Sequence, residues 1–563
     1  MAYQVEHNMK DYEKTYSELK WDIPEYFNFA RDVFDKWAED EDKLAMWWVD
    51  SEGEEQKISF SQFQSRSTKL ANVLKAQGIK KGDRVFLLLP PVPQWWETML
   101  ALFRLGAIVM PGTSQLKPKD IKYRFEASEG VAIITNEDNA PKVDEVADQI
   151  AELKTKIVVG QREGWISYED AVNNASDEQN IENTKSDDPA ILFFTSGTTG
   201  NPKMTVHTNA SYGIGHQITG KYWLDLTPED VHWNLSDTGW AKAAWSSFFG
   251  PWNMGATVFV HYNPGKFSAK ETLQVLEKYP ITTLCGPPTA YRTFVLEDLK
   301  QFNFATLRHC VAAGEPLNPE VIEVWKKATG TIIRDGYGQT ESVLMVGTFP
   351  CLDVKFGSMG KPSPGFYVSI INEEAEEIEA GKEGDIAVRL QPERPVGLFK
   401  EYWNDPERTD ATRRGDWYLT GDRAYKDEDG YFWFVGRADD VIISSGYRIG
   451  PFEVESALVE HPSVAESAVV ASPDEMRGEI VKAYVILAPG YQPSDNLVKE
   501  IQNHVKNVTA PYKYPREIEF VETLPKTISG KIRRIELRDQ EKKKKLKLMA
   551  ERKLESEIAV DKE

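Results

Sequence analysis

The chain has 563 residues, 41% of them hydrophobic and 28% charged, and a formal net charge of −21. This composition predicts a folded globular protein and excludes a long disordered chain. The acidic excess argues against a nucleic-acid-binding protein, although a loop of backbone N–H groups could still hold a phosphate locally.

Residues 58–390 alternate short apolar runs with longer segments of helical spacing. The runs that predict strands are 85–90, 131–135, 156–160, 190–195, 256–262, 281–288 and 307–316. Runs that are apolar on both faces, and separated by helix-length segments, predict parallel sheets covered by helices. Their number predicts more than one such sheet.

The pattern changes after residue 365. The segments YVSIIN, GDIAVRL, WYLTGD and GYFWFVG alternate apolar and polar residues and predict antiparallel β structure. Beyond Arg437, two helix-like runs and three strand-like runs predict a small α+β domain, with the boundary at GRADD, residues 436–440. The Lys-rich tail from about Glu536 predicts a solvated terminal helix or disorder.

Signals for the cellular compartment are few. The three cysteines, Cys285, Cys310 and Cys351, form no CxxC pair, which predicts a reducing compartment and excludes a disulfide framework. The first residues lack the basic-then-apolar pattern of a secretory signal, and the longest apolar stretches are too short to span a bilayer. We therefore expect a cytoplasmic protein with no membrane span.

The most informative motif is the loop of residues 195–203, TSGTTGNPK, which follows a strand-like run. Its glycines permit close backbone approach, its hydroxyls and N–H groups can donate, and Lys203 can neutralise charge, so the loop suits a polyphosphate. It is not a Walker A loop, because Pro202-Lys203-Met204 breaks that pattern. The alternative interpretation is an ordinary surface turn.

Three further motifs are weak when taken alone. Residues 335–341, DGYGQTE, combine an aromatic ring, a hydroxyl and a carboxylate that could stack a base, touch a phosphate and hold a metal. In residues 417–422, WYLTGD, the carboxylate could accept from a ribose diol or simply form a turn. In residues 524–534, Lys531 follows a Ser-Gly turn, which alone is typical of a basic surface loop.

Together, in this order and at these separations, the four motifs resemble those of the acyl-adenylate-forming superfamily. That superfamily includes acyl-CoA synthetases, adenylation domains of peptide synthetases and luciferase-like enzymes, and the resemblance covers about residues 25–540. It implies an α/β and α+β multidomain fold. Residues 1–436 would form a large AMP-binding domain of two stacked βαβ subdomains plus a small β-barrel. Residues 437–440 would be the hinge, with Asp439 at its centre, and residues 441–563 a mobile small α+β domain with the Lys-rich tail.

The resemblance also implies a site for ATP with Mg²⁺. The phosphate loop would comprise Thr195, Ser196, Gly197, Thr198, Thr199, Gly200 and Lys203. The adenine and nucleotide walls would comprise Gly314, Glu315, Pro316, Asp335, Gly336, Tyr337 and Gln339. Thr340 would contact the α-phosphate, Glu341 would support Mg²⁺, and Asp422 and Arg437 would bind the ribose hydroxyls. Arg448 would approach the phosphate, and Lys531 would bridge the carboxylate and the α-phosphate.

The implied acyl pocket comprises Trp240, Ala241, Lys242, Ala313 and Gly338, and the implied CoA tunnel comprises Ser445 and Gly446. Acetate-specific relatives carry a Trp at the position of Gly338, so we expect an acid larger than acetate, of short-to-medium chain length and including branched acids. Lys242 departs from the apolar residue of animal medium-chain enzymes. Whether it points into the pocket or away from it is left open, as is the choice between a nucleotide contact and a structural role for His207.

The implied reaction joins a carboxylate and ATP to give acyl-AMP, from which a thiol then takes the acyl group. Because two anions must meet, Mg²⁺, Lys203 and Lys531 would supply charge neutralisation, with Lys531, Thr340 and Glu341 as the catalytic residues. Coenzyme A is the expected acceptor because no further domain follows the Lys531 motif, and loading of a separate carrier protein is the alternative. A luciferase-type mono-oxygenase or a non-catalytic scaffold is disfavoured, since nothing demands oxygen chemistry and every expected catalytic position is filled. We further expect a monomer or homodimer active in fatty acid metabolism, with a protein acyltransferase acting on Lys531.

Overall fold

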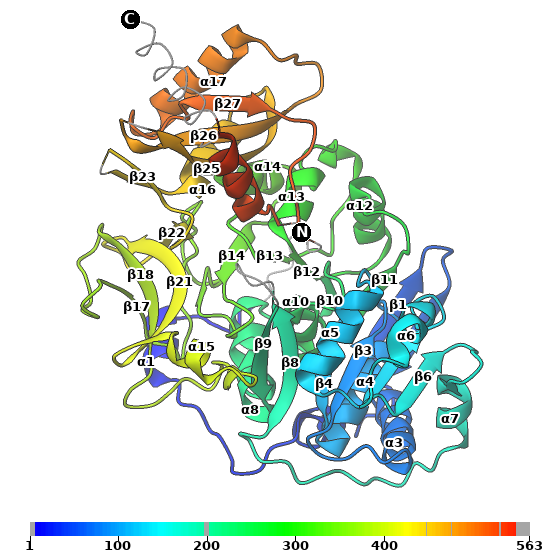
Figure 1. Ribbon diagram of the computed structural model, residues 1–563. Coiled ribbons are helices and arrows are strands. Elements are labelled where there is room, and N and C mark those ends of the chain that lie inside the picture. The colour runs from blue at the N-terminus through cyan, green and yellow to red at the C-terminus, as the bar shows by residue number, and fades with distance from the viewer. Residues whose placement is uncertain are drawn as a thin grey trace, which may run out of the picture.

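The computed structural model describes residues 6–195, 202–445, 447–474, 476–527, 531–545 and 547. The predicted site residues Ser196, Gly197, Thr198, Thr199, Gly200 and Gly446 lie outside this part of the chain, as does the side chain of Arg448. Figure 1 shows a large body made of two broad sheets and a smaller antiparallel one, with a C-terminal lobe (residues 442–545) above it.

The first large sheet has nine strands in the order β16-β15-β14-β13-β12-β10-β11-β1-β2. These are β1 (Leu44–Asp50), β2 (Glu55–Ser59), β10 (Val231–Asn234), β11 (Thr257–Tyr262), β12 (Thr283–Gly286), β13 (His309–Ala313), β14 (Ile333–Tyr337), β15 (Val346–Gly347) and β16 (Lys361–Pro362). The pairs from β14 through to β1 are parallel, and the pairs β14–β15, β15–β16 and β1–β2 near the two edges are antiparallel. The predicted strands 256–262, 281–288 and 307–316 are β11, β12 and β13.

The second large sheet has eight strands in the order β19-β9-β8-β4-β3-β5-β6-β7. These are β3 (Arg84–Leu88), β4 (Ile108–Pro111), β5 (Ala132–Asn136), β6 (Thr155–Val159), β7 (Ile166–Ser167), β8 (Pro189–Thr195), β9 (Lys203–Thr208) and β19 (Glu401–Tyr402). Its pairs from β8 through β4 and β3 to β7 are parallel, while β9 returns antiparallel to β8. The prediction of more than one parallel sheet is confirmed.

Helix α4 (Pro93–Leu105) explains why the two sheets stack. All of its residues except Gln94 are buried, and a helix buried on every side must lie between layers rather than on a surface. One hydrophobic cluster joins Met46 of the first sheet to Val85 of the second and includes the buried Trp95 and Trp96.

The remaining helices and helical turns cover the sheets or connect their strands. They are α1 (Tyr12–Glu18), η1 (Ala30–Phe34), α2 (Asp35–Trp37), α3 (Phe60–Ala76), α5 (Pro118–Ser128), α6 (Ala140–Ala147), α7 (Tyr168–Asn174), α8 (Asn209–Gly213), α9 (His216–Ile218), η2 (Thr219–Trp223), α10 (Ala241–Ala244), η3 (Trp245–Phe249), α11 (Gly250–Asn253), α12 (Ala269–Lys278), α13 (Pro288–Phe294), η4 (Leu299–Gln301), α14 (Pro319–Thr329) and α15 (Pro406–Asp410). None of the helices in the described residues is long and apolar enough to cross a membrane.

The third sheet is the antiparallel unit that the sequence predicts as a small β-barrel. It runs β17-β18-β21-β20, with β22 also paired to β21. Its strands are β17 (Val368–Ile371), β18 (Glu383–Arg389), β20 (Arg413–Arg414), β21 (Trp417–Lys426) and β22 (Phe432–Arg437). Every pair is antiparallel, as the alternating pattern after residue 365 predicts.

The C-terminal lobe has its own five-stranded sheet and its own core. Its elements are β23 (Ile442–Ser444), β24 (Tyr447–Ile449), α16 (Pro451–Val459), β25 (Val464–Asp474), β26 (Gly478–Leu487), α17 (Asp495–Val508) and β27 (Glu517–Phe520). The core holds Val469 and Val485 of the sheet together with Ile501 of α17. The predicted α+β character of this region is confirmed.

The start of the Lys-rich tail is a helix over residues 534–545. One side of it is not solvated as predicted, because Leu537 and Glu541 are buried against the lobe. The Glu541 carboxylate accepts from Lys482 at 2.7 Å and from Ser472 at 2.8 Å. A buried carboxylate needs such partners, so this end of the lobe is pinned to its sheet.

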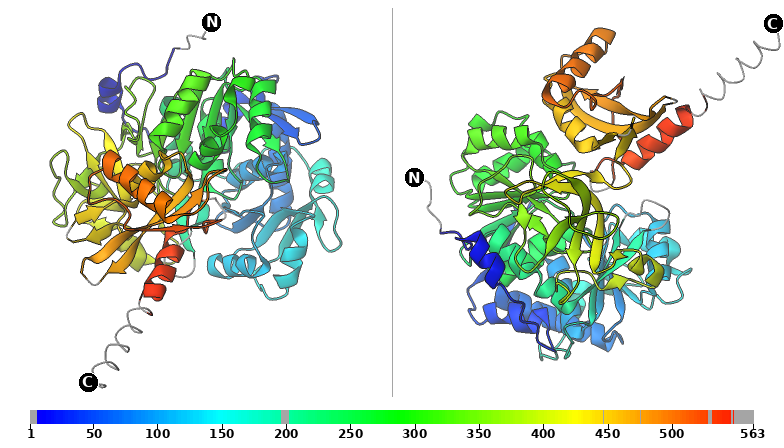
Figure 2. Two further views of the ribbon diagram at one scale, coloured as in Figure 1. Left: turned by 90° about the horizontal axis from the view of Figure 1, so that it is seen from above. Right: turned by 90° about the vertical axis from the view of Figure 1, so that its left-hand side faces the viewer.

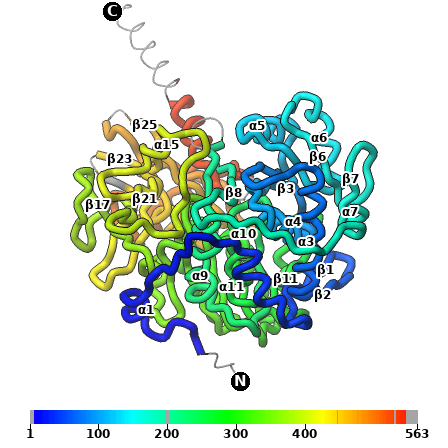
Figure 3. The backbone as a smooth tube through the Cα atoms, turned by 90° about the horizontal axis from the view of Figure 1, so that it is seen from below, coloured from blue at the N-terminus to red at the C-terminus, as the bar shows by residue number. Residues whose placement is uncertain are grey.

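The views from other sides place the two ends of the chain. In Figure 2 the C-terminal lobe lies over the large body and the helix of residues 534–545 leads away from it. In Figure 3, seen from below, the N-terminal segment with α1 crosses the opposite face of the body, past α9 and α11.

Candidate active site

A cavity of about 350 Å³ lies where the carboxyl ends of strands from both large sheets meet the C-terminal lobe. Its walls include Thr195 at the end of β8, Ala313 at the end of β13, Gly336 in β14, and Lys531 from the lobe. In open α/β sheets, ligands bind beyond the carboxyl ends of parallel strands, so this cavity is the candidate active site.

Lys531 reaches the cavity from far along the chain. A Cβ built on Gly314 would lie 3.8 Å from its Cε and 3.9 Å from its Nζ, and two hydrogen bonds with Thr527 hold its backbone. The side chain is solvent-exposed because it projects into the open cavity. Protein nevertheless surrounds the ammonium, so burial lowers its pKa while the carboxylate of Glu315 raises it. The predicted convergence of Thr195 and Lys531 on one cavity is therefore observed.

Asp422 is the centre of a polar network beside the cavity. It faces Arg437 across the β21–β22 pair and bonds to it at 3.1 Å. The hydroxyl of Tyr337 donates to it at 2.6 Å and the amide of Gln339 at 2.7 Å. Burial raises the pKa of the Asp422 carboxyl, and Arg437 opposes that shift most strongly. The network presents one fixed carboxylate, the acceptor that a diol requires.

Glu341 is held by a residue that the sequence analysis missed. The hydroxyl of Tyr402, in edge strand β19, donates to Glu341 Oε1 at 2.7 Å. The Lys203 ammonium lies 5.0 Å from the centre of the Tyr402 ring, because β19 pairs with β9, which Lys203 begins. Burial lowers the pKa of Lys203, while Glu341 raises it. No motif marks Tyr402, since its position follows from strand pairing alone.

His207 has a structural role. It is fully buried, and burial lowers its pKa to about 3, so the ring is neutral. Its Nε2 lies 2.6 Å from the backbone oxygen of Thr340, which can only accept, and its Nδ1 lies 3.0 Å from Ser211 Oγ. The ring therefore fixes the backbone at Thr340 from beneath.

Two other predicted nucleotide residues have their side chains engaged with protein. Burial raises the pKa of Asp335 to about 7, and its carboxyl accepts from the backbone N–H of Gly336 and of Leu317. Glu315 lines the cavity and also pairs with Arg292 at 2.9 Å. Their roles toward a nucleotide stay predictions.

The other end of the cavity is formed by aromatic and apolar side chains. Of the predicted acyl-pocket residues, Trp240, Ala241, Lys242, Ala313 and Gly338 all line the cavity. The sequence analysis missed a further set of lining residues, which are His216, Thr219, Trp223, Trp245, Val343 and Leu344. His216, Thr219 and Trp223 are spaced three and four apart on the continuous α9–η2 segment, and this helical spacing is the signal that could have identified them.

Lys242 points into the cavity, which settles the alternative left open by the sequence. Its ammonium donates to the backbone oxygen of Ala313 at 3.1 Å. Burial lowers its pKa, the nearby Cys285 thiol raises it, and Lys531 lowers it further. Two lysines therefore face the same cavity at the junction of its polar and apolar ends.

Ser445, the described residue of the predicted tunnel, and Asp439 of the predicted hinge do not line this cavity. Ser445 is exposed and accepts from Arg477 at 3.2 Å. Asp439 lies between two cations, with its carboxylate 3.9 Å from Arg437 and 3.8 Å from Arg538. Arg538 also pairs with Asp440 at 2.7 Å, so the helix of residues 534–545 is tied to the predicted hinge.

A second cavity, of about 530 Å³, adjoins the first. The residues that line both are Leu235, Ser236, Asp237 and Pro287. The second cavity runs between Trp233 and Phe259 of the first large sheet and Trp96 of α4. Asn234 lines it, and its Oδ1 has no hydrogen-bond partner among the residues that the structure describes. Among the described residues, no group of three or more His, Cys, Asp or Glu could hold a metal ion.

The chain matches two protein families. Residues 33–403 match the AMP-binding enzyme family, and residues 453–531 match the AMP-binding enzyme C-terminal domain. The second match ends at Lys531, the residue that the lobe inserts into the cavity.

Similar curated proteins cover nearly the whole chain. The mitochondrial acyl-coenzyme A synthetase ACSM3 of Mus musculus is 53% identical over 545 residues, which are 95% of this chain and 94% of the mouse protein. The mitochondrial acyl-coenzyme A synthetase ACSM4 of Rattus norvegicus is 52% identical over 92% of this chain and 91% of its own length.

Solved structures share the fold. An anthranilate CoA ligase in complex with anthranoyl-AMP matches with a TM-score of 0.85 and 30% identity, over 94% of this chain and 99% of its own. An acyl-CoA synthetase of Brucella canis matches with a TM-score of 0.74 and 34% identity, over 95% and 99%. Both agree with a large N-terminal domain that carries a small C-terminal one.

Proposed function

The chain belongs to the AMP-binding enzyme family, and we propose that it is an ATP-dependent, AMP-forming ligase for a short-to-medium-chain carboxylic acid, branched acids included. It forms acyl-AMP and then transfers the acyl group to coenzyme A. The observation that carries this proposal is the meeting of Lys531 with the end of the phosphate loop, at Thr195, in one cavity. ATP, Mg²⁺, the acid and coenzyme A are substrates or cosubstrates.

The first half-reaction needs a cation between two anions. The carboxylate oxygen attacks the α-phosphorus, the bond to the pyrophosphate breaks, and acyl-AMP remains. Lys531 and Lys242 face the cavity in which the carboxylate and the α-phosphate would meet. Lys203, whose pKa the nearby Glu341 raises, would flank the leaving pyrophosphate. Glu341 is the residue that would hold the Mg²⁺ bound with ATP, and that ion would supply charge neutralisation at the phosphates.

Substitution of Lys531 tests this assignment. Lys531→Ala should lower acid-dependent pyrophosphate release by at least about 100-fold, because a charge-assisted contact to the reacting anions is lost. It should spare attack of coenzyme A on supplied acyl-AMP. Lys526→Ala is the matched control. Lys526 lies in the same loop, but its ammonium pairs with Glu466 at a distance of 2.8 Å, and neither residue lines the cavity. Equal loss of both half-reactions would remove the assigned role.

The thiol needs an approach that does not displace the adenylate. The second cavity joins the first at Ser236 and Asp237, close to where the activated carbonyl would lie, so we propose that the pantetheine thiol enters through it. Rotation of the C-terminal lobe about Asp439 would withdraw Lys531 and bring Ser445 and Gly446 toward this path. On this proposal residues 437–440 are the hinge between the domains 1–436 and 441–563.

A bulky side chain in the second cavity would distinguish thiol attack from the formation of acyl-AMP. Thr289→Trp places an indole in its wall and should slow CoA-dependent AMP release while leaving pyrophosphate release unchanged. A variant that slows pyrophosphate release instead would place the thiol path elsewhere. CoA-dependent AMP formation scored over a panel of straight and branched carboxylates would identify the acid.

Selectivity against acetate rests on small residues at the acyl end. A Cβ on Gly338 would lie 2.8 Å from the backbone oxygen of Val343, so a side chain there also shifts the backbone. Gly338→Trp would therefore change the backbone as well as the size of the pocket. A second substitution, at the wall formed by Trp245, is needed to test pocket size by itself. Trp245→Leu, which removes an indole that lines the cavity, should favour longer acids by about fourfold for each additional buried methylene.

Location and partners follow from the same features. We propose a reducing compartment, the cytoplasm, because Cys285, Cys310 and Cys351 are all free thiols. The similar mammalian enzymes are named as mitochondrial, so cell fractionation decides between the cytoplasm and the mitochondrion.

A protein acyltransferase acting on Lys531 would need the lobe to rotate first, since the ammonium faces the cavity. A monomer or homodimer is the expected state in solution, which sedimentation analysis would distinguish.

A further inference from the structure

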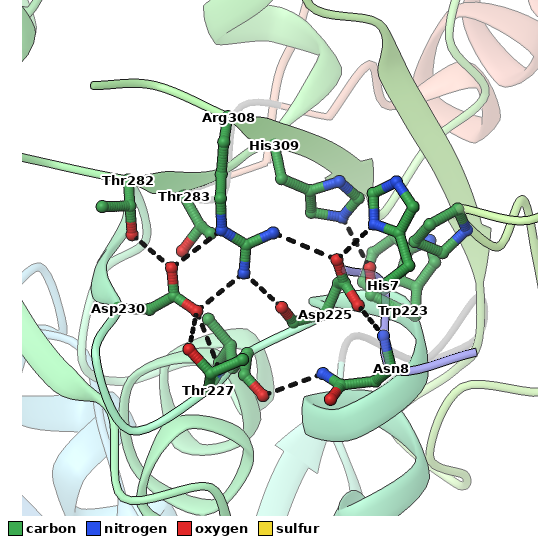
Figure 4. Close-up of polar contacts among 12 residues, drawn as sticks. His7, Asn8, Trp223, Asp225, Thr227, Asp230, Thr282, Thr283, Arg308 and His309 are labelled. Carbon is green, nitrogen blue, oxygen red and sulfur yellow. Dashed lines mark hydrogen bonds and ion pairs between the residues drawn. The ribbon is translucent and has the colours of Figure 1, made fainter. Parts of the chain in front are cut away.

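The N-terminal clamp, residues 7–9, holds the turn that follows one wall of the acyl end. His7 Nδ1 lies 2.7 Å from Asp225 Oδ2, and the backbone N–H of Asn8 donates to Asp225 Oδ1 at 2.9 Å. The amide of Asn8 donates to the backbone oxygen of Leu226 at 3.0 Å. Figure 4 shows His7 and Asn8 converging on Asp225 from one side while Arg308 approaches from the other.

Asp225 needs these partners. It is almost fully buried and adopts a left-handed backbone with φ of 54°, a conformation that is uncommon outside glycine and that aspartate tolerates better than most residues. Arg308 pairs with Asp225 at 3.0 Å and with Asp230 at 2.7 Å, so one guanidinium serves two buried carboxylates. The contacts of His7 and Asn8 complete the shell that a buried carboxylate requires.

The turn at Asp225 follows directly on η2, and Trp223 ends η2 as a wall of the acyl end. Its indole N–H donates to the backbone oxygen of Asp335 at 3.2 Å, and its own backbone oxygen lies 2.7 Å from His309 Nε2. A Cβ on Gly336 would lie 2.2 Å from the Trp223 ring. The Trp223 ring therefore packs directly against the backbone of Gly336 and cannot move closer to the sheet.

On another side, the hydrophobic cluster that contains Trp223 includes a residue of the N-terminal segment. Met9 is fully buried, and it belongs to the same hydrophobic cluster as Trp223, Ala313 and Leu344, all of which line the cavity. The clamp thus supplies a second layer behind the pocket wall. Buried side chains keep their positions only while such neighbours fill the space behind them.

We propose that the N-terminal clamp sets the acyl chain-length selectivity by holding Trp223 against Gly336. This proposal rests on the proposed acyl-CoA ligase activity. The clamp residues touch neither substrate nor nucleotide, so they act as positioning residues. Weakening the clamp lets the ring retreat, which lengthens the acyl end and leaves the nucleotide end unchanged.

The test compares kcat/KM for butanoate and octanoate in the full-length enzyme. Met9→Ala removes the filling behind the ring, and the octanoate-to-butanoate ratio should rise about fourfold for each methylene newly accommodated. The pair His7→Ala and Asn8→Ala, made together, should shift the ratio in the same direction. Met9→Leu conserves volume and should restore the native ratio.

Tyr16→Phe is the matched control in the same segment. It removes the hydrogen bond from Tyr16 to the backbone oxygen of Phe366 at 2.8 Å, away from the turn at Asp225, and should leave the ratio unchanged. A uniform fall in kcat/KM for all acids, or an unchanged ratio in both clamp variants, would overturn the proposal. Failure of the native enzyme to activate any acid would instead refute the proposed function.

Discussion

The two ends of the active-site cavity are built in different ways. At the nucleotide end, polar groups bond one another in a closed network, with Asp422 joined to Tyr337, Gln339 and Arg437. At the acyl end, Trp223 and Trp245 pack with ring centres 6.0 Å apart, and Met9 belongs to the same buried hydrophobic cluster as Trp223. On the proposed function, the chemistry common to all acids would depend on charge and hydrogen bonds, and selectivity among acids would depend on packing.

This difference separates the effects of substitutions. A change at the nucleotide end should lower the rate by the same factor for every acid, because all acids share one nucleotide. A change at the acyl end should alter the order of the acids. If substitutions at the nucleotide end changed the order of kcat/KM values among the acids, the two ends would not have these separate roles.

Among the variants that compare the two ends of the cavity, the largest effect is expected at Asp422. Asp422→Asn removes the charge that faces Arg437 and replaces one of the two acceptor oxygens by an NH2 donor. Hydrogen bonds to a charged group contribute about 1.5–3 kcal/mol. We expect kcat/KM for ATP to fall by about 100-fold, equally for every acid, measured by pyrophosphate release.

Asp385→Asn is the control for this variant. Asp385 lies in the same sheet and pairs with Arg414 at 2.7 Å, outside the cavity. Asp385→Asn should lower the stability of the protein but should not lower kcat/KM for ATP. A similar kinetic loss in both variants would mean that damage to the sheet, and not the ribose site, explains the result at Asp422.

The next largest effect is expected at Lys242, where the two ends meet. Lys242→Met keeps the length of the side chain and removes its charge, so KM for the carboxylate should rise by about thirtyfold with KM for ATP unchanged. Lys266→Met, in the wall of the second cavity, should leave the carboxylate KM as it is. Equal changes in both KM values would assign Lys242 to the nucleotide.

A smaller effect is expected at Arg538, which ties the C-terminal lobe to the hinge. Arg538→Gln removes its ion pairs with Asp440 and Asp439, which are partly exposed and worth about 1 kcal/mol at most. The first half-reaction should slow about fivefold for all acids, because Lys531 is less often in place, while thiol attack is spared.

Arg538→Lys should recover part of that rate because it keeps the charge. Arg533→Gln is the comparison variant, since Arg533 pairs only locally with Glu536 at 3.0 Å. If both half-reactions slow together in Arg538→Gln, the contact stabilises the lobe and does not set its orientation.

The same contrast explains what the sequence could predict. The strands lie in contiguous apolar runs, and the nucleotide residues lie in contiguous motifs. The resemblance carried by those motifs to the acyl-adenylate-forming superfamily identified Thr195, Gly338 and Lys531. Tyr402 could not be found, because only the pairing of β19 with β9 brings it to Glu341. Asp225 was missed for the same reason, since its partners are more than 80 residues away along the chain.

The direction of Lys242 marks the limit of sequence reasoning. The resemblance to the superfamily placed it near the acyl site, but a lysine can equally extend into solvent. The outcome depended on the backbone oxygen of Ala313, which lies 71 positions away in sequence and accepts from the ammonium. Contacts of this kind belong to the assembled fold and leave no local pattern.

The smallest effect is expected at His216, whose Nε2 lies buried without a hydrogen-bond partner in the described residues. Burial holds its pKa well below the usual value, so the ring is neutral, and its Nδ1 lies 3.1 Å from Thr219 Oγ1. His216→Phe removes the unpaired polar atom from the acyl end and should raise kcat/KM for unsubstituted acids about threefold. Thr219→Val leaves the imidazole of His216 in place and removes the hydroxyl that lies beside its Nδ1. This variant should instead lower kcat/KM for unsubstituted acids. Acids that carry a hydroxyl group able to pair with Nε2 should show the opposite order in His216→Phe, and equal behaviour of plain and hydroxylated acids would show that the imidazole does not face the chain.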